Sequence, residues 1–140
     1  MKYIKSCGFV AFKEIDGERR YLIIKSRNGD VGFPKGHTEA GESEGETAIR
    51  ETKEETGVTV EIIEGFRRQI EYPLPRMKNT VKQTVYLLGR CLTDELIPQE
   101  SEVSSAAFVP YGEALGALTF EETKSILREA EIFISERRYP

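Results

Sequence analysis

The sequence predicts an α/β protein in which a mixed β-sheet is sandwiched between helices as an α/β/α arrangement. Two observations indicate this class. β-prone segments occur before, between and after two segments with helical periodicity, which is typical of a sheet covered by helices. The chain also contains no internal repeat, low-complexity segment or linker, so we expect one domain spanning residues 1–140.

The first elements are predicted to be a pair of strands. Residues 3–12 are β-prone, and residues 21–25, YLIIK, repeat this character after a turn at Asp16 and Gly17. Residues 27–34, RNGDVGFP, are rich in turn-forming residues. We therefore expect a loop there, which leads to the short sequence Lys-Gly-His at 35–37.

Both ends of the first predicted helix are visible in the sequence. Ser43 and Glu46 have the spacing of a capping box, in which each side chain bonds the backbone N–H of the other residue. Gly57 is suited to the left-handed conformation that ends a helix. With about 100° per residue, one face of this helix is expected to pack inward. That face carries Ala48, Ile49, Thr52 and Thr56.

The second half of the chain is predicted to contain more strands and a final helix. Strands are expected at 58–63, 66–72, 81–92 and 106–109. An interruption near Gly65 separates the first two, and the last is followed by Pro110. A basic loop at 73–80 and a polar connection at 94–105 link these strands. Residues 120–134 have apolar residues at helical spacing.

Composition limits the class of protein. Charged residues make up 31% and hydrophobic residues 39%, as in globular proteins in water, and no apolar run approaches the roughly 18 residues that span a membrane. The N-terminus has no secretory signal pattern, so we expect a cytoplasmic protein with no membrane partner. Cys7 and Cys91 lie in apolar segments, and we expect them to be buried thiols.

The formal net charge of −4 gives the protein no overall attraction to nucleic acid. A phosphate ligand remains compatible with this charge, because a bound cation reverses the local sign of an acidic site. We expect a monomer whose ligand is a small molecule.

The first helix carries three glutamates on adjacent turns, Glu51, Glu54 and Glu55. Like charges at this spacing repel, and a solvated acidic face is the usual interpretation of such a helix. Glu51 and Glu55, however, can direct two carboxylates at one hard cation, and a carbonyl of the preceding glycine loop can add a third oxygen. Arg50 can orient a carboxylate, with Glu42 as its partner.

These residues resemble the signature box of the Nudix hydrolases at every fixed position. The matching pattern is Gly36, five residues, Glu42, seven residues, and then RETKEETGV at 50–58. Thr52 stands where the family usually has an aliphatic residue. The resemblance implies a Nudix fold and hydrolysis of a nucleoside diphosphate linked to another group, with Mg²⁺ or Mn²⁺ as the cofactor.

The similarity extends beyond the box. FPKGHTEAGE at 33–42, IIEGFRRQIEY at 62–72 and TVKQTVYLLGR at 80–90 are similar to the asymmetrical bis(5′-nucleosyl)-tetraphosphatases. This resemblance implies diadenosine tetraphosphate as the substrate, with ATP and AMP as products. The basic loop is a few residues longer here, and Val-Gly-Phe at 31–33 replaces a segment where tryptophan is common. Both differences concern the substrate preference.

The resemblance also implies roles for particular residues. The implied metal ligands are Glu51, Glu55, Glu54, the backbone of Gly36, and Glu102. The implied catalytic residues are Glu51, Glu54, Glu102 and Arg50, and either Glu51 or Glu102 can be the general base. The implied substrate-binding residues are Lys35, His37 and Lys82 for phosphate, and Tyr72 and Phe120 for adenine.

Alternative interpretations stay open at this stage. Within the enzymes they are Nudix hydrolases acting on RNA 5′ ends, on diphosphoinositol polyphosphates or on damaged nucleoside triphosphates. A different class is a non-catalytic module that senses a nucleotide, although the chain retains the acidic residues that such modules usually lose. His37 and Lys82 also have a simple explanation as surface residues, and Tyr72 and Phe120 as partly buried core residues.

Overall fold

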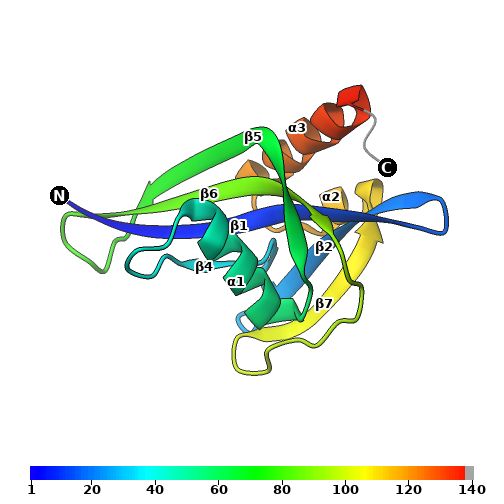
Figure 1. Ribbon diagram of the computed structural model, residues 1–140. Helices are drawn as coiled ribbons and strands as arrows, with labels where there is room; N and C mark the ends of the chain where they lie inside the picture. The colour runs from blue at the N-terminus through cyan, green and yellow to red at the C-terminus, as the bar shows by residue number, and fades with distance from the viewer. Residues whose placement is uncertain (138–140) are drawn as a thin grey trace.

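The computed structural model describes residues 1–137, and its central element is the long strand β1 (Figure 1). β1 runs parallel to β6 on one side and antiparallel to β2 and β4 on the other. The strand order is β3-β2-β1-β6-β5, and β7 pairs with β2. The strands are β1 (Lys2–Ile15), β2 (Glu18–Ser26), β3 (Val31–Gly32), β4 (Lys35–His37), β5 (Val60–Pro73), β6 (Thr80–Cys91) and β7 (Val103–Pro110). The helices are α1 (Glu44–Thr56), α2 (Tyr111–Ala117) and α3 (Glu121–Arg137).

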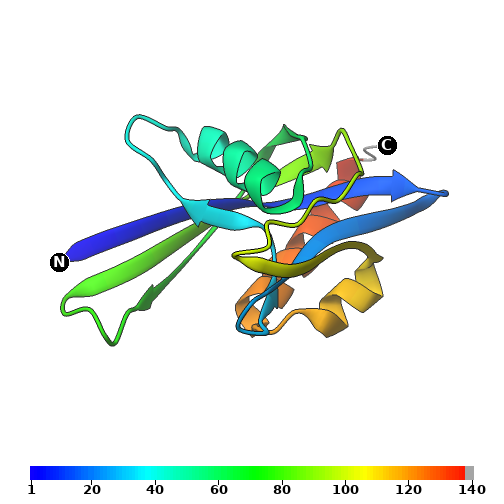
Figure 2. The ribbon, with the colours of Figure 1, turned by 90° about the horizontal axis from the view of Figure 1, so that it is seen from below.

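Helices cover both faces of this mixed sheet. Successive side chains of a strand point to opposite faces, and β1 follows this rule. Phe9 packs with Ala48 of α1 in one hydrophobic cluster. Val10 packs with Leu127 of α3 in the other. In Figure 2, α1 lies on one side of the sheet, and α2 and α3 lie on the other. The predicted three-layer α/β/α architecture is therefore confirmed.

The predicted ends of α1 are confirmed. Ser43 accepts a hydrogen bond from the backbone N–H of Glu46, whose side chain accepts one from the backbone N–H of Ser43. Gly57 has φ 84°, and its N–H donates to the carbonyl of Lys53 at 2.9 Å. Local chemistry therefore fixes where α1 starts and stops, and with it the position of the acidic residues along the helix.

The prediction for the inward face of α1 was wrong at one residue. Ala48, Thr52 and Thr56 are fully buried as expected, but Ile49 is 36% exposed. Thr47, which lies on the other side of Ala48, is buried instead. The helix is thus rotated about its axis relative to the expectation. This rotation turns the flank that carries Glu51 and Glu55 toward the sheet.

Other differences concern short or irregular elements. The expectation of two helices missed α2, β3 lies in the segment expected to be loop, and no strand was expected where β4 forms directly after it. α2 has only seven residues, two of them glycine, so it has little intrinsic helical signal. It is held by packing, since the ring of Tyr111 lies 6.3 Å from that of Tyr21. The two strands expected around Gly65 form one strand, β5, with a register shift between Ile63 and Arg67.

Two expectations from composition can be compared with the structure. Cys7 and Cys91 are both buried and unpaired, as expected. Among residues 1–137, no helix is long and apolar enough to cross a membrane.

Candidate active site

The short strand β4 positions Lys35, Gly36 and His37. It pairs antiparallel with β1, so that His37 lies opposite Ser6, Gly36 opposite Cys7, and Lys35 opposite Gly8. Because side chains alternate along a strand, Lys35 and His37 share one face, and Gly36 presents the other. The backbone of Gly36 lies against α1, since a Cβ at this position would lie 2.1 Å from the carboxyl group of Glu51.

Of the α1 acids that line the cavity, Glu55 is buried and Glu51 is partly buried. Glu55 is only 8% exposed, and the backbone N–H of Lys35 donates to its Oε1 at 3.1 Å. Burial raises the pKa of Glu55 to about 7, and the nearby charges of Glu51 and Glu102 add to this. Burial also raises the pKa of Glu51, with Glu54 contributing next. The protein thus holds carboxylates that disfavour one another's charge, an arrangement that a cation would offset.

Glu102 comes from a distant part of the chain, and the end of α1 fixes its loop. The backbone N–H of Ile97 donates to the carbonyl of Thr56 at 2.8 Å, and that of Gln99 donates to the carbonyl of Glu55 at 3.0 Å. Glu102 then donates its own N–H to the carbonyl of Gln99. These bonds occupy carbonyls left free at the helix end and bring Glu102 to the same cavity as the α1 carboxylates.

Arg50 connects α1 to the loop before it. Its Nε donates to Glu42 at 2.7 Å, one terminal nitrogen donates to Glu54 at 3.0 Å, and the other donates to the carbonyl of His37 at 2.9 Å. The hydrogen bond from Arg50 lowers the pKa of Glu42 to about 2. Arg50 also lies 3.4 Å from the carboxylate of Glu51. Its fork of donors therefore holds β4, the loop and the acidic helix together.

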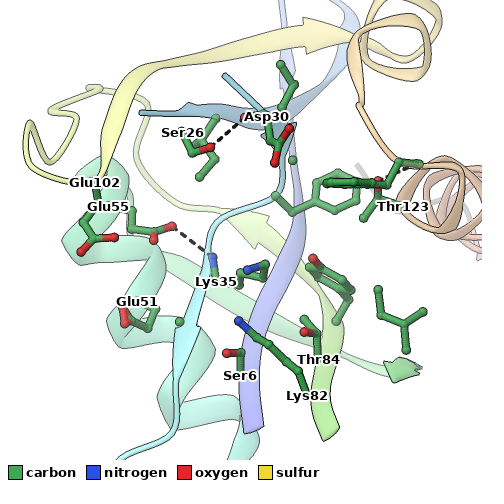
Figure 3. A pocket seen from close by; sticks show the side chains of 18 of the residues that line it. Ser6, Ser26, Asp30, Lys35, Glu51, Glu55, Lys82, Thr84, Glu102 and Thr123 are labelled. Atoms are coloured by element: carbon green, nitrogen blue, oxygen red, sulfur yellow. Dashed lines mark hydrogen bonds between the residues drawn. The ribbon is translucent and has the colours of Figure 1, made fainter. Parts of the chain in front are cut away.

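These elements surround one cavity of about 760 Å³ (Figure 3). Nine of the eleven predicted site residues line it: Lys35, Gly36, His37, Glu51, Glu55, Tyr72, Lys82, Glu102 and Phe120. Arg50 and Glu54 do not line the cavity. They form the ion pair described above on the far side of Glu51. The structure therefore assembles most of the predicted site from segments that are far apart in the sequence.

The cavity wall opposite the acids is basic and aromatic. Burial and the charge of Lys35 lower the pKa of Lys82. Burial, followed by Lys82 and Lys35, lowers the pKa of His37. The smaller part of each shift comes from neighbouring positive groups, whose repulsion an anion would relieve. Tyr72 is 42% exposed and Phe120 is 50% exposed, so both rings are accessible at the cavity rather than part of the core.

The sequence did not single out several lining residues. No role was assigned to Tyr86 or Phe33 from the sequence, and both are buried with their rings 5.5 Å apart. Other polar residues gave no signal, because their position in the cavity depends on how the strands, the loops and α3 pack together. The lining residues of this kind are Ser6, Ser26, Asn28, Asp30, Thr84, Gln99, Glu122 and Thr123.

The donor set is suited to a hard divalent cation. Glu51, Glu55 and Glu102 place carboxylate oxygens along one cavity, and such cations prefer oxygen ligands. The close approach of the Gly36 backbone to the Glu51 carboxyl group agrees with this chemistry. Within residues 1–137, no three His, Cys, Asp or Glu side chains already converge as a metal-binding group. Glu54 in particular is directed to Arg50.

Comparison with known proteins is consistent with this geometry. Over 94% of its length, the chain is 32% identical to bis(5′-nucleosyl)-tetraphosphatase [asymmetrical] of Rattus norvegicus, of which 95% is covered. It is 32% identical to the putative mutator protein MutT4 of Mycobacterium tuberculosis, covering 94% of this chain and 56% of that protein. The crystal structure of a C. elegans Ap4A hydrolase binary complex matches with a TM-score of 0.83 and 26% identity, over 95% of this chain and 98% of that one. The family model of the NUDIX domain matches residues 8–130, and the chain therefore belongs to the Nudix family.

Proposed function

We propose that this protein hydrolyses dinucleoside polyphosphates, and that it converts diadenosine tetraphosphate and water to ATP and AMP. The observation that carries this proposal is one cavity that joins acidic residues, basic residues and two accessible aromatic rings. A polyphosphate with a nucleoside at each end needs all three kinds of group. The similarity to the rat tetraphosphatase over nearly the whole chain supports the same substrate class.

Nudix hydrolases generally require a divalent metal, and we propose Mg²⁺ or Mn²⁺ here. When bound, the cation would neutralise charge on phosphate oxygens and make a water molecule more acidic. Its proposed ligands are the carboxylates of Glu51, Glu55, Glu54 and Glu102 and the backbone carbonyl of Gly36. Glu54 must exchange its contact with Arg50 to take part, whereas Glu51 and Glu55 already line the cavity.

The basic and aromatic residues have the binding role in this proposal. Lys35, His37 and Lys82 hold phosphate oxygens, which relieves the repulsion among these groups. Tyr72 and Phe120 stack on the adenine rings, since both side chains are well exposed and line the cavity. Arg50 is a positioning residue, because it orients Glu51 and the β4 backbone and does not line the cavity.

The chemical step is an in-line displacement at phosphorus. The oxygen of a water molecule forms a bond to one phosphorus atom of the chain. The bond from that phosphorus to the bridging oxygen on the opposite side breaks, and the bridging oxygen leaves with the electron pair as a terminal phosphate oxygen of the other product. The carboxylate of Glu51 or Glu102 takes the proton of the attacking water and releases it to solvent.

The test is a product assay with competing substrates. The purified protein is incubated with Mg²⁺ and diadenosine tetraphosphate, capped or triphosphorylated RNA, a diphosphoinositol polyphosphate, or an oxidised nucleoside triphosphate. The products are then separated by ion exchange. The proposal expects ATP and AMP from the tetraphosphate with the highest kcat/KM of the set. Comparable or faster turnover of another class overturns the substrate assignment, and no turnover of any class indicates a binding module.

The same assay in ¹⁸O-labelled water identifies the phosphorus that is attacked. Label found only in AMP places the attack on the phosphorus that ends in AMP, and label found only in ATP places it on the adjacent phosphorus. Label divided between the products shows that the chain binds in two registers. Each of these outcomes fixes where the phosphate chain lies relative to Glu51 and Glu102.

A further inference from the structure

Two buried hydroxyl groups in the cavity have no partner. Ser6 is fully buried and Thr84 is 1% exposed. Within the described part of the chain, neither Ser6 Oγ nor Thr84 Oγ1 has a hydrogen-bond partner, although both residues line the cavity. Buried polar groups in folded proteins nearly always have a partner. These hydroxyls therefore do not contribute to the fold through hydrogen bonds, and because both residues also line the cavity, this points to a ligand.

Strand register places the two hydroxyls side by side. Ser6 on β1 lies directly opposite Thr84 on β6 and, on its other side, opposite His37 on β4. Neighbouring strands lie about 4.8 Å apart, and paired side chains project from the same face. His37, Ser6 and Thr84 thus form one row across the sheet. A single phosphate group above this row can accept a hydrogen bond from both hydroxyls.

Positive charge adjoins this row on both sides. Lys35 lies opposite Gly8, two residues after Ser6 on β1, and Lys82 precedes Thr84 by two residues on β6. Both lysines line the same cavity, and Figure 3 shows Lys82 beside Ser6 and Thr84, with Lys35 above them. Within residues 1–137, the Lys82 ammonium has no ion pair, so it is available to a ligand. An anionic oxygen is a partner that all of these donors can share.

We propose that the hydroxyls of Ser6 and Thr84 bind a phosphate group of the substrate between Lys35 and Lys82. This inference rests on the proposed function in that the cavity must hold a polyphosphate. In this proposal Ser6 and Thr84 donate the hydrogen bonds that orient one phosphate, and the two lysines supply positive charge. Hydrogen bonds from neutral hydroxyls to an anionic oxygen are directional, whereas an ammonium acts as a point charge.

The experiment compares two variants at position 84. Thr84→Val keeps the shape of the side chain and removes the hydroxyl, and Thr84→Ser keeps the hydroxyl. Ser6→Ala removes the second hydroxyl. Binding of ATP and of adenosine is measured by isothermal titration calorimetry in Mg²⁺, and KM and kcat are measured with diadenosine tetraphosphate. We expect Thr84→Val and Ser6→Ala to weaken ATP binding about tenfold or more each. Adenosine binding stays the same, and Thr84→Ser stays within about threefold of the wild type for ATP.

Thr52→Val is the matched control. Thr52 Oγ1 is also buried without a partner in the described residues, but Thr52 does not line the cavity. This variant should therefore leave ATP binding unchanged. The melting temperature of every variant is recorded, and Thr84→Val is expected to be at least as stable as the wild type because it removes an unpaired polar atom.

Three outcomes overturn the inference. Unchanged ATP binding in both Thr84→Val and Ser6→Ala shows that the hydroxyls do not contact phosphate. An equal loss of adenosine binding shows a distorted cavity or a contact to the nucleoside, and an equal loss in Thr84→Ser shows that shape matters and not the hydroxyl. A wild-type protein that binds ATP but does not cleave the tetraphosphate contradicts the proposed function alone, since the binding comparison still decides the role of the hydroxyls.

Discussion

The carboxyl group of Glu51 occupies the space that a side chain at position 36 would need. A Cβ at Gly36 would lie 2.1 Å from this group, well inside van der Waals contact. The absence of a side chain at position 36 thus leaves room for the Glu51 carboxyl group against β4. This places Glu51 between Lys35 and His37, which flank the glycine.

The first prediction concerns this close approach. Gly36→Ala should push Glu51 out of position and lower kcat by about 100-fold, because a displacement near 1 Å at a reacting group can cost that much. The matched control is Gly116→Ala, an exposed position in α2 where an added Cβ meets no atom within 4 Å. That variant should keep full turnover and gain up to about 1 kcal/mol of stability. Steady-state kinetics and thermal unfolding check both, and full activity of Gly36→Ala would contradict the proposed role of Glu51.

The second prediction concerns Glu55. Glu55→Gln should lower kcat by about two orders of magnitude or more, because an amide is a poorer cation ligand than a carboxylate and a metal contributes several kcal/mol. The fold should persist, since the amide oxygen can still accept the bond from the N–H of Lys35. Thermal unfolding without metal should give a melting temperature equal to or above that of the wild type, because burial already disfavours the carboxylate.

Glu64→Gln is the control for Glu55→Gln, because Glu64 is exposed and does not line the cavity. It should match the wild type in turnover and in binding of Mn²⁺, measured by electron paramagnetic resonance. Retained Mn²⁺ binding in Glu55→Gln, together with normal turnover, would remove Glu55 from the metal site.

The third prediction concerns Arg50 as a positioning residue. Arg50→Lys keeps the charge but loses the fork that contacts Glu42, Glu54 and the His37 carbonyl together. We expect kcat to fall at least tenfold with a small change in KM, and the apparent Kd for Mn²⁺ to rise, because residues that orient the ligands of a metal typically contribute about 10–100-fold. Arg90→Lys, at a surface ion pair with Glu61, should change neither quantity. A change in KM alone would assign Arg50 to substrate contact instead.

The fourth prediction concerns stability in acid. Hydrogen bonds from Arg67 and then Lys5 lower the pKa of Glu44 from 4.5 to about 2. The unfolded chain therefore binds a proton at higher pH than the folded chain does. The stabilisation from Glu44 is present above about pH 4.5 and is lost as the pH falls toward 2.

Glu44→Gln tests this effect. Because the group is partly solvent-exposed, we expect a loss of only about 1 kcal/mol at pH 7 and no further difference from the wild type near pH 2. Urea unfolding at a series of pH values measures the difference. A difference that grows as the pH falls would have the wrong sign for a carboxylate with a lowered pKa.

The features that could be predicted from the sequence are set by interactions between residues close together in the chain. The features that could not be predicted are set by contacts between distant residues. The ends of α1 follow from local chemistry, so Ser43 and Gly57 mark them in the sequence. Gly36, Glu51, Glu54 and Glu55 belong to a gapped pattern with a chemical reason for its spacing. Site residues outside that pattern, such as Lys82 and Phe120, were implied only by the family resemblance. Ile49 was misplaced because periodicity defines a face only to within about one residue, and packing on the sheet selects the rotation. α2 has no local signal and depends on contacts such as that of Tyr111 with Tyr21.

Ser6 and Thr84 illustrate the same limit within the site. A serine or threonine in a strand usually faces solvent or packs as a small side chain. Only the parallel register of β1 and β6 places both hydroxyls in one row, and that register depends on residues nearly eighty positions apart. The carboxylates of α1 could therefore be predicted from one helix, whereas the row of Ser6 and Thr84 required the folded sheet.

The last prediction concerns Lys82, whose ammonium lies among groups of the same sign. Lys82→Met keeps most of the length of the side chain and removes the charge. KM for diadenosine tetraphosphate should rise about tenfold or more, because a charged contact to phosphate contributes about 1.5–3 kcal/mol. kcat should change less, since Lys82 is proposed to hold the substrate and not to take part in proton transfer. The melting temperature should stay the same or increase, because burial and Lys35 both disfavour the ammonium.

The control for Lys82→Met is Lys13→Met, at a partly exposed position of β1 that does not line the cavity. It changes the net charge by the same amount, so it separates a local contact from general attraction of an anionic substrate. Raising the salt concentration should weaken binding to the wild type more than to Lys82→Met if the contact is electrostatic. An equal rise in KM in both variants would show long-range attraction alone, and Lys82 would then lose its assignment as a phosphate ligand.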